Sequence, residues 1–242
     1  MTGHARWVRI CHWILTASLL TLAFSGIEIL MVHPRLYWGD AGNDLTPALF
    51  ELPISRNYRH GGFEKATPFF SNAAGPTSAT RTYEIFNQNG WGRSLHFLAA
   101  WWLVLPGAMY LVGGLFGGHF RSHIWPTAKE LAPDSIWGDL RNHLRLRIPQ
   151  ASGGPNYGVL QKAAYSFVIF VAAPLIVLTG LTMSPAVTAA YPFLLRLFGG
   201  YGSARTIHFF AFVALLLFVI AHVVMVVKSG FKRQLQAMTV GE

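Results

Sequence analysis

Four long apolar runs, separated by more polar connections, dominate the pattern of the chain. A helix rises about 1.5 Å per residue, so roughly 20 apolar residues cross the ~30 Å hydrocarbon core of a bilayer. The pattern therefore predicts an all-α membrane protein, a four-transmembrane-helix bundle that forms a single domain over residues 1–242. The predicted spans are residues 10–32, 95–118, 163–185 and 206–227.

Two of these spans contain a proline, Pro106 in the second and Pro174 in the third. Proline removes a backbone donor, but membrane helices tolerate it when neighbouring helices satisfy the freed carbonyl. We expect both prolines to bend their spans without breaking them.

The first connection, residues 33–93, is long and rich in glycine, proline and aromatic residues, without a clear helix or strand period. Long irregular loops are uncommon unless they are functional, so we expect a small ordered cap that contacts a partner. The alternative is a flexible linker.

The second connection, residues 119–162, is basic and suits a surface of anionic headgroups. The third, residues 186–203, is apolar enough for a short interfacial helix.

The positions of lysine and arginine predict the orientation of the spans. With the N-terminus inside, the inner segments hold 11 of the 19 basic residues, and six of the other eight lie in the long connection 33–93. Long connections obey the positive-inside rule poorly. The pattern therefore favours both termini on the cytoplasmic side of a bacterial inner membrane, with residues 33–93 as the outer loop and 119–162 as the inner loop.

Composition supports a membrane protein and excludes some cofactor chemistry. The chain is 52% hydrophobic and only 12% charged, which is too apolar for an ordinary soluble domain. Its net charge of +9 is explained by segments that flank the membrane, and no nucleic-acid-binding motif is present. The single cysteine, Cys11, excludes an intrachain disulfide and a C-x-x-C-H attachment of haem.

The fourth span contains two histidines, His208 and His222, in a run of 22 residues without a charged side chain. Fourteen residues of helix place them within about 40° of one face and roughly 21 Å apart along the axis. A single histidine in a membrane helix is often satisfied by a neighbouring helix. Two on one face at opposite depths favour a pair of ligand sites instead.

Two further histidines match these in depth. His12 begins the first span on the inner side, and His96 begins the second span on the outer side. A b-type haem held by two imidazoles needs one histidine from each of two facing helices. We therefore predict two haem b groups, an inner one bound through its iron by His12 with His222, and an outer one by His96 with His208. Two imidazoles would fill both axial positions of each iron, which suits electron transfer and disfavours the binding of a substrate at the iron.

An arginine precedes three of these histidines by three residues: Arg9, Arg93 and Arg205. Residues three apart are neighbours on a helix, and arginine pairs strongly with carboxylates. We expect these arginines to bind haem propionates. The alternative is that they simply flank the membrane spans.

These residues resemble a known family, the dihaem cytochrome b subunits of membrane formate dehydrogenases, Ni-Fe hydrogenases and thiosulfate reductases, which are bacterial cytochrome b561-like proteins. The likeness covers all four spans. It is carried by RICHWIL, GRSLHF, PNYGVLQKAAY, PLIVLTGLTMSP, ARTIHF and AHVVMVV. The family's haem ligands match His12, His96, His208 and His222.

The resemblance implies a transmembrane electron-transfer subunit between the quinone pool and a periplasmic redox partner. The TGLTMSP-like segment is similar to cytochromes that accompany molybdopterin oxidoreductases, so the partner is expected to be a molybdopterin or iron–sulfur protein. Substrate catalysis would then belong to the partner and not to this chain. By similarity, Asn156 and Gln161 at the entry to the third span would lie beside the quinone.

Two alternatives stay open. A stand-alone cytochrome b561-type quinol oxidoreductase would itself reduce a small acceptor at the outer face, and would purify without a partner subunit. A transporter or membrane anchor would use the histidines as substrate or proton sites, and a purified preparation would be colourless.

Overall fold

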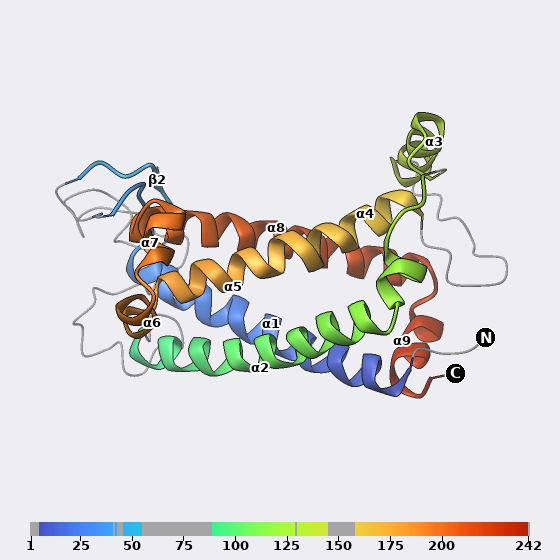
Figure 1. Ribbon diagram of the computed structural model, residues 1–242, viewed down its shortest axis with the longest axis horizontal. Coiled ribbons are helices and arrows are strands. Elements are labelled where there is room, and N and C mark those ends of the chain that lie inside the picture. Colours follow the sequence, from blue (N-terminus) through green and yellow to red (C-terminus); the bar gives the residue numbers. More distant parts are fainter. Residues whose placement is uncertain are drawn as a thin grey trace. The chain divides into compact units, whose positions relative to one another are not determined.

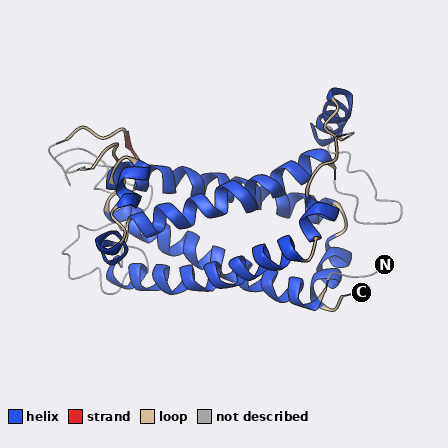
Figure 2. Ribbon diagram, in the orientation of Figure 1, coloured by secondary structure: helices blue, strands red, loops and turns tan. Residues whose placement is uncertain are grey.

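The computed structural model describes residues 5–40, 42, 46–54, 89–128, 130–144 and 158–241, which are mostly helical (Figures 1 and 2). Four helices in these residues are long and apolar enough to cross a membrane, at Arg6–Val32, Trp91–Phe116, Val159–Thr182 and Tyr201–Lys228. The prediction of an all-α membrane protein with four spanning helices is confirmed. The observed helices begin four to six residues earlier than predicted, because the polar residues that precede each apolar run continue its helix.

The first, second and fourth spans are each a single α-helix: α1 (Arg6–Val32), α2 (Asn89–Phe116) and α8 (Tyr201–Lys228). Helix α2 continues through Pro106 without interruption. The third span consists of α4 (Val159–Phe167), the π-helical turn η4 (Val168–Ala172) and α5 (Ala173–Thr182). The wider turn comes just before Pro174, which has no N–H to donate to the carbonyl one turn earlier. Neither proline breaks its span.

Short elements connect the spans. Ser184 and Pro185 begin α6 (Pro185–Ala190), with proline at the first helical position where a missing N–H costs nothing. Helix α7 (Phe193–Phe198) ends at Gly199, whose φ of 70° is left-handed. The third connection thus contains two short helices where one was expected. The remaining helices are η3 (Phe120–Ile124), α3 (Pro133–Leu144) and α9 (Phe231–Thr239).

The described part of the first connection contains a small hairpin. Strand β1 (Arg35–Leu36) pairs antiparallel with β2 (Phe50–Glu51), with Leu36 opposite Phe50. The sequence pattern did not indicate these strands, because each is only two residues long. We call residues 33–40 and 46–54 the cap; residues 55–88 lie outside the described part of the chain, so an ordered cap over the whole connection stays a prediction.

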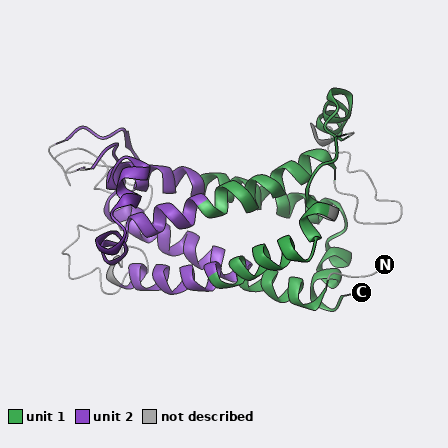
Figure 3. Cartoon of the chain, viewed as in Figure 1, with its two compact units in different colours: residues 1–14, 105–174, 213–242 green, residues 15–104, 175–212 purple. Residues whose placement is uncertain are grey.

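The chain divides into two compact units (Figure 3). Unit 1 contains Met1–Ile14, Leu105–Pro174 and Val213–Glu242, and unit 2 contains Leu15–Val104 and Leu175–Phe212. Each unit therefore holds one segment of every spanning helix. The prediction of a single domain over 1–242 stays a prediction.

The division also separates the four candidate ligands into two pairs. His12 and His222 belong to unit 1, and His96 and His208 belong to unit 2. Each candidate site is therefore built entirely within one unit.

Candidate functional site: two histidine pairs

In unit 2, His96 of α2 faces His208 of α8. The ring centroids are 6.3 Å apart and the ring planes are inclined by 58°. The structure therefore brings together the two residues that the sequence pattern assigned to the outer site.

In unit 1, His12 of α1 faces His222 of α8 with the same spacing. Their ring centroids are also 6.3 Å apart, with an interplanar angle of 53°. The ring of Trp13 lies edge-on to His12 at 5.4 Å, and Phe218 stacks on His222 at 5.9 Å with an angle of 18°. The residues assigned to the inner site are thus also adjacent, and one aromatic ring packs against each of them.

The spacing of both pairs fits a metal ion held between two imidazoles. With metal–nitrogen bonds of about 2 Å, two rings on opposite sides of one metal have their centres about 6 Å apart. Among the described residues, no group of three or more His, Cys, Asp or Glu side chains could hold a metal. Two protein ligands suffice where a porphyrin supplies the other four, so the donor set fits haem.

Each histidine of the unit 2 pair contacts a hydroxyl group. Ser25 Oγ of α1 lies 2.9 Å from His96 Nδ1, and Thr179 Oγ1 of α5 lies 3.0 Å from His208 Nδ1. Sequence reasoning missed both hydroxyls. The available signal was a small hydroxyl residue in an apolar run, directly followed by glycine.

Those glycines lie against the same two imidazoles. A Cβ at Gly26 would be 3.6 Å from His96 Cε1, and a Cβ at Gly180 would be 3.4 Å from His208 Cε1. A methyl group at either position would be in ordinary van der Waals contact with the imidazole, so each glycine lies next to the edge of one ring.

Two of the three candidate arginines have backbone partners. Arg9 Nη1 donates to the carbonyl of Thr239 at 2.7 Å, at the end of α9. Arg205 donates through Nη2 to the carbonyl of His33 in the cap. Arg93 is exposed on α2. A guanidinium has five donors, so these contacts leave N–H groups for a further acceptor.

The cap is anchored on α8 close to His208. Thr206 Oγ1 donates to the carbonyl of Tyr37 at 2.6 Å, and Ser203 Oγ accepts from the amide of Gly39 at 2.8 Å. The amide of Gly202 in turn donates to the carbonyl of Gly39 at 2.9 Å. Gly39 has a φ of 102°, a backbone conformation that favours glycine. Unit 2 therefore combines the histidine pair with an ordered surface outside the spans.

Of the two candidate quinone residues, Asn156 lies outside the described residues, and Gln161 is on α4 in unit 1. Gln161 Nε2 donates to the hydroxyl of Tyr165 at 2.8 Å. The Tyr165 ring meets Phe218 edge-on at 5.9 Å, and Phe218 stacks on His222. A continuous series of contacts therefore joins Gln161 to the candidate haem ligand His222. Sequence reasoning missed Tyr165 and Phe218.

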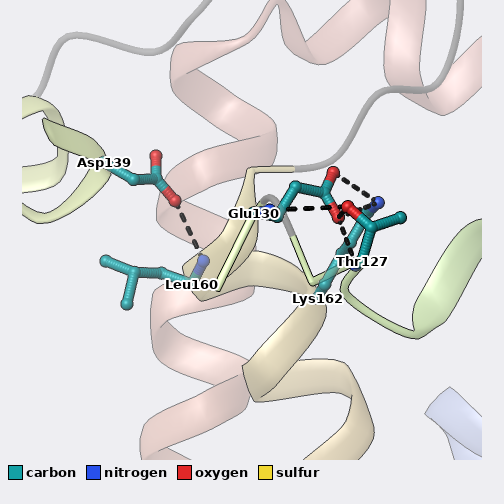
Figure 4. A network of polar contacts seen from close by, with 5 residues as sticks. All are labelled: Thr127, Glu130, Asp139, Leu160 and Lys162. Carbon is teal, nitrogen blue, oxygen red and sulfur yellow. Dashed lines mark hydrogen bonds and ion pairs between the residues drawn. The ribbon is translucent and has the colours of Figure 1, made fainter. Parts of the chain in front are cut away.

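A polar network fixes the start of α4 beside Gln161 (Figure 4). Lys162 Nζ lies 2.8 Å and 3.1 Å from the two carboxylate oxygens of Glu130, which also accepts from the amide of Thr127 at 2.7 Å. Asp139 Oδ2 accepts from the amide of Leu160 at 2.9 Å, satisfying a free donor of the helix N-terminus. The hydrogen bond from Lys162 is the main reason that the pKa of the Glu130 carboxyl is lowered.

Comparison with known proteins finds a family and a relative that resemble this chain. The family model described as prokaryotic cytochrome b561 matches residues 3–241. A relative from Azospira oryzae, provisionally named protein-methionine-sulfoxide reductase subunit YedZ1, is 29% identical over 223 residues, which cover 92% of this chain and 89% of the relative. No solved structure matches the chain significantly.

Proposed function

The chain belongs to the prokaryotic cytochrome b561 family, and from this premise we propose that it is a dihaem cytochrome b subunit that transfers electrons between the quinone pool and a periplasmic oxidoreductase. Membership itself implies a membrane-embedded haem b protein. The two haems, the quinone and the nature of the partner are the proposed part.

The observation that carries the proposal is the pair of matched histidine contacts. Each pair joins α8 to a different helix at a ring spacing of 6.3 Å, which suits two axial imidazoles on one iron. His12 with His222 would hold one haem and His96 with His208 the other. Bound haem supplies reversible one-electron chemistry, and two axial imidazoles leave no open position at iron for a substrate.

The arginines near these pairs are proposed to bind propionates. Arg9 and Arg205 are held by backbone carbonyls, which limits the freedom of each guanidinium while leaving other N–H donors available. Arg93 is exposed one turn before His96. A carboxylate beside any of these groups would gain a charge-assisted hydrogen bond.

The quinone is proposed to bind in unit 1, at the start of α4. Tyr165 accepts a hydrogen bond from Gln161 Nε2, and because a phenolic hydroxyl both donates and accepts, it is the proposed donor to a quinone carbonyl oxygen. Glu130, Lys162 and Asp139 keep this end of α4 in place. By its similarity to the family pattern, Asn156 is proposed to complete the site.

The partner is proposed to be a periplasmic molybdopterin or iron–sulfur subunit. The name of the Azospira oryzae relative describes it as a subunit of a reductase, which supports electron delivery to a separate catalytic protein. The cap is the proposed docking surface, because it is anchored beside His208 and presents Trp38 with 64% of its surface exposed. This assignment places the cap outside a bacterial inner membrane and both termini in the cytoplasm.

Reduction of the purified cytochrome by a short-chain quinol tests the function. The Tyr165→Phe variant keeps the ring on Phe218 but removes the hydroxyl, and the loss of one hydrogen bond of about 1 kcal/mol should slow haem reduction by roughly fivefold to tenfold. Tyr191→Phe, at an exposed tyrosine in unit 2, is the matched control and should reduce normally.

Equal rates in wild type and Tyr165→Phe would argue against this quinone site. A wild-type protein that quinol does not reduce at all would argue against the function. Purification of the cytochrome with an affinity tag should also recover a redox subunit. A cytochrome that purifies without a partner and directly reduces a small acceptor would favour the stand-alone alternative.

A further inference from the structure

Two hydroxyl–glycine pairs, Ser25–Gly26 on α1 and Thr179–Gly180 on α5, contact the histidines of unit 2 in the same way. In each pair the hydroxyl oxygen lies about 3 Å from Nδ1 of the imidazole, and the following glycine lies beside Cε1 of the same ring. The two pairs come from different helices and act on different histidines. We name them the hydroxyl–glycine pairs.

The hydrogen bonds of the two hydroxyls favour one tautomer of each imidazole. Ser25 Oγ donates its single hydrogen to the carbonyl of Thr21 at 2.8 Å, and Thr179 Oγ1 donates to the carbonyl of Leu175 at 2.7 Å. A hydroxyl has only one hydrogen to give. With that hydrogen given to a carbonyl, each oxygen can only accept from the histidine, which favours the tautomer with the proton on Nδ1 of His96 and of His208 and the lone pair on Nε2.

Burial protects these hydrogen bonds from competition by water. Ser25 and Thr179 are both 0% exposed, so water does not compete for the Nδ1 proton. The glycine after each hydroxyl lies beside the same ring, where a Cβ would be 3.6 Å from Cε1 of His96 and 3.4 Å from Cε1 of His208. Each imidazole is thus hydrogen-bonded at Nδ1 and adjoins a residue without a side chain at Cε1.

We propose that Ser25–Gly26 and Thr179–Gly180 are positioning residues that fix the tautomer of both axial ligands of the unit 2 haem and lower its reduction potential. The inference rests on the proposed ligation of this haem by His96 and His208. A hydrogen bond accepted from the far nitrogen of a ligating imidazole raises the basicity of the ligand. A more basic ligand favours the oxidised, more positive iron.

The expected effect is measurable by redox titration. Losing one such hydrogen bond changes a free energy by about 1 kcal/mol, which approaches a tenfold change in the reduction equilibrium. For a one-electron couple, tenfold corresponds to about 59 mV. Ser25→Ala and Thr179→Val should therefore each raise the potential of one haem by an amount approaching this value, and leave the other haem unchanged.

The test uses full-length, haem-loaded protein, with optical redox titration and electron paramagnetic resonance of the oxidised haems. Both variants must shift the same one of the two components, because His96 and His208 bind one iron. The conservative variants Ser25→Thr and Thr179→Ser keep a hydroxyl, so their reduction potentials should match those of the wild type.

The matched control is Thr182→Val. Thr182 is also on α5 and is 1% exposed, but its hydroxyl donates to the carbonyl of Leu178 at 2.8 Å, whereas the hydroxyl beside His208 Nδ1 is that of Thr179. It should leave both potentials unchanged. Ser18→Ala, at a buried hydroxyl on α1, is the corresponding control for Ser25.

Several outcomes would overturn the proposal. The proposal fails if Ser25→Ala and Thr179→Val both retain two haems with unchanged potentials. It also fails if the two variants shift the potentials of different haems. If Ser25→Ala loses a haem, recovery of that haem in Ser25→Thr supports the hydrogen bond, and failure to recover it contradicts it. If the wild-type protein does not contain two bis-histidine haems, the proposed function itself would be contradicted.

Discussion

The two histidine pairs share one spacing but have different surroundings. In unit 2 the imidazoles contact the hydroxyls of Ser25 and Thr179, whereas in unit 1 Trp13 and Phe218 pack against them. The proposed ligation of one iron by each pair would require this spacing at both sites. The neighbouring side chains are free to differ, and hydrogen bonding and burial tune the potential of a bound haem. We therefore expect two haems with distinct potentials.

The units also differ outside the pairs. Unit 2 carries the cap, which is anchored on α8 through Thr206 and Ser203. Unit 1 carries the Gln161–Tyr165 contact and the network of Glu130 and Lys162. A surface that suits a protein partner thus accompanies one pair, and polar groups that suit a small ligand accompany the other.

The largest effect is expected from removing one ligand of either pair. His222→Ala should lose the unit 1 haem and keep the other, and His208→Ala should do the reverse, because each iron then has only one protein ligand. Haem content should fall from two per chain to one in each variant. The control His60→Ala, in the first connection, should retain both. Loss of both haems from either single variant would show that the two sites are not independent.

A smaller effect is expected from the ring that stacks on His222. Phe218→Leu removes an aromatic contact worth about 0.5–1.5 kcal/mol, so the unit 1 haem should be released more readily, by up to roughly tenfold. Competition for haem by apomyoglobin measures this release. Phe116→Leu is the control, because Phe116 is 90% exposed on α2 in the same unit. Equal release from both variants would mean that stacking does not support this ligand.

The smallest effect is expected at Glu130. Its pKa is lowered chiefly by the hydrogen bond from Lys162, so the folded state is stabilised above the ordinary glutamate pKa, and this stabilisation is lost as the pH falls through the lowered value. Glu130 is partly exposed, so the gain should not exceed about 1 kcal/mol.

Thermal unfolding of Glu130→Gln tests this contact. The variant should melt slightly below wild type at pH 7, and the difference should shrink as the pH approaches 4. A difference that grows on acidification would contradict the sign of the pKa change.

The spans and the histidine pairing could be predicted from the sequence because they depend on regular geometry. Helical rise gives depth, and depth matched His12 with His222 and His96 with His208, pairs that the structure brings together. Chemistry at a metal also restricts the residue types to a few, so the candidates were easy to recognise.

The rest depends on contacts between distant segments. Ser25 and Thr179 lie 71 and 29 residues from the histidines that they contact, and the glycine after each of them does not by itself predict such a distant contact. The same holds for the π-helical turn η4 and for the two-residue strands of the cap. Arg9 and Arg205 were noticed because of their spacing, but their carbonyl partners in α9 and the cap could not be predicted.

The central claim is that this chain holds two bis-histidine haems. The most direct test is the haem content of the purified full-length protein, measured as the pyridine haemochrome against protein determined by amino-acid analysis, together with electron paramagnetic resonance of the oxidised form. We predict two haem b groups per chain, both low-spin with two axial imidazoles. One haem per chain, or a high-spin iron with an open position, would contradict the account.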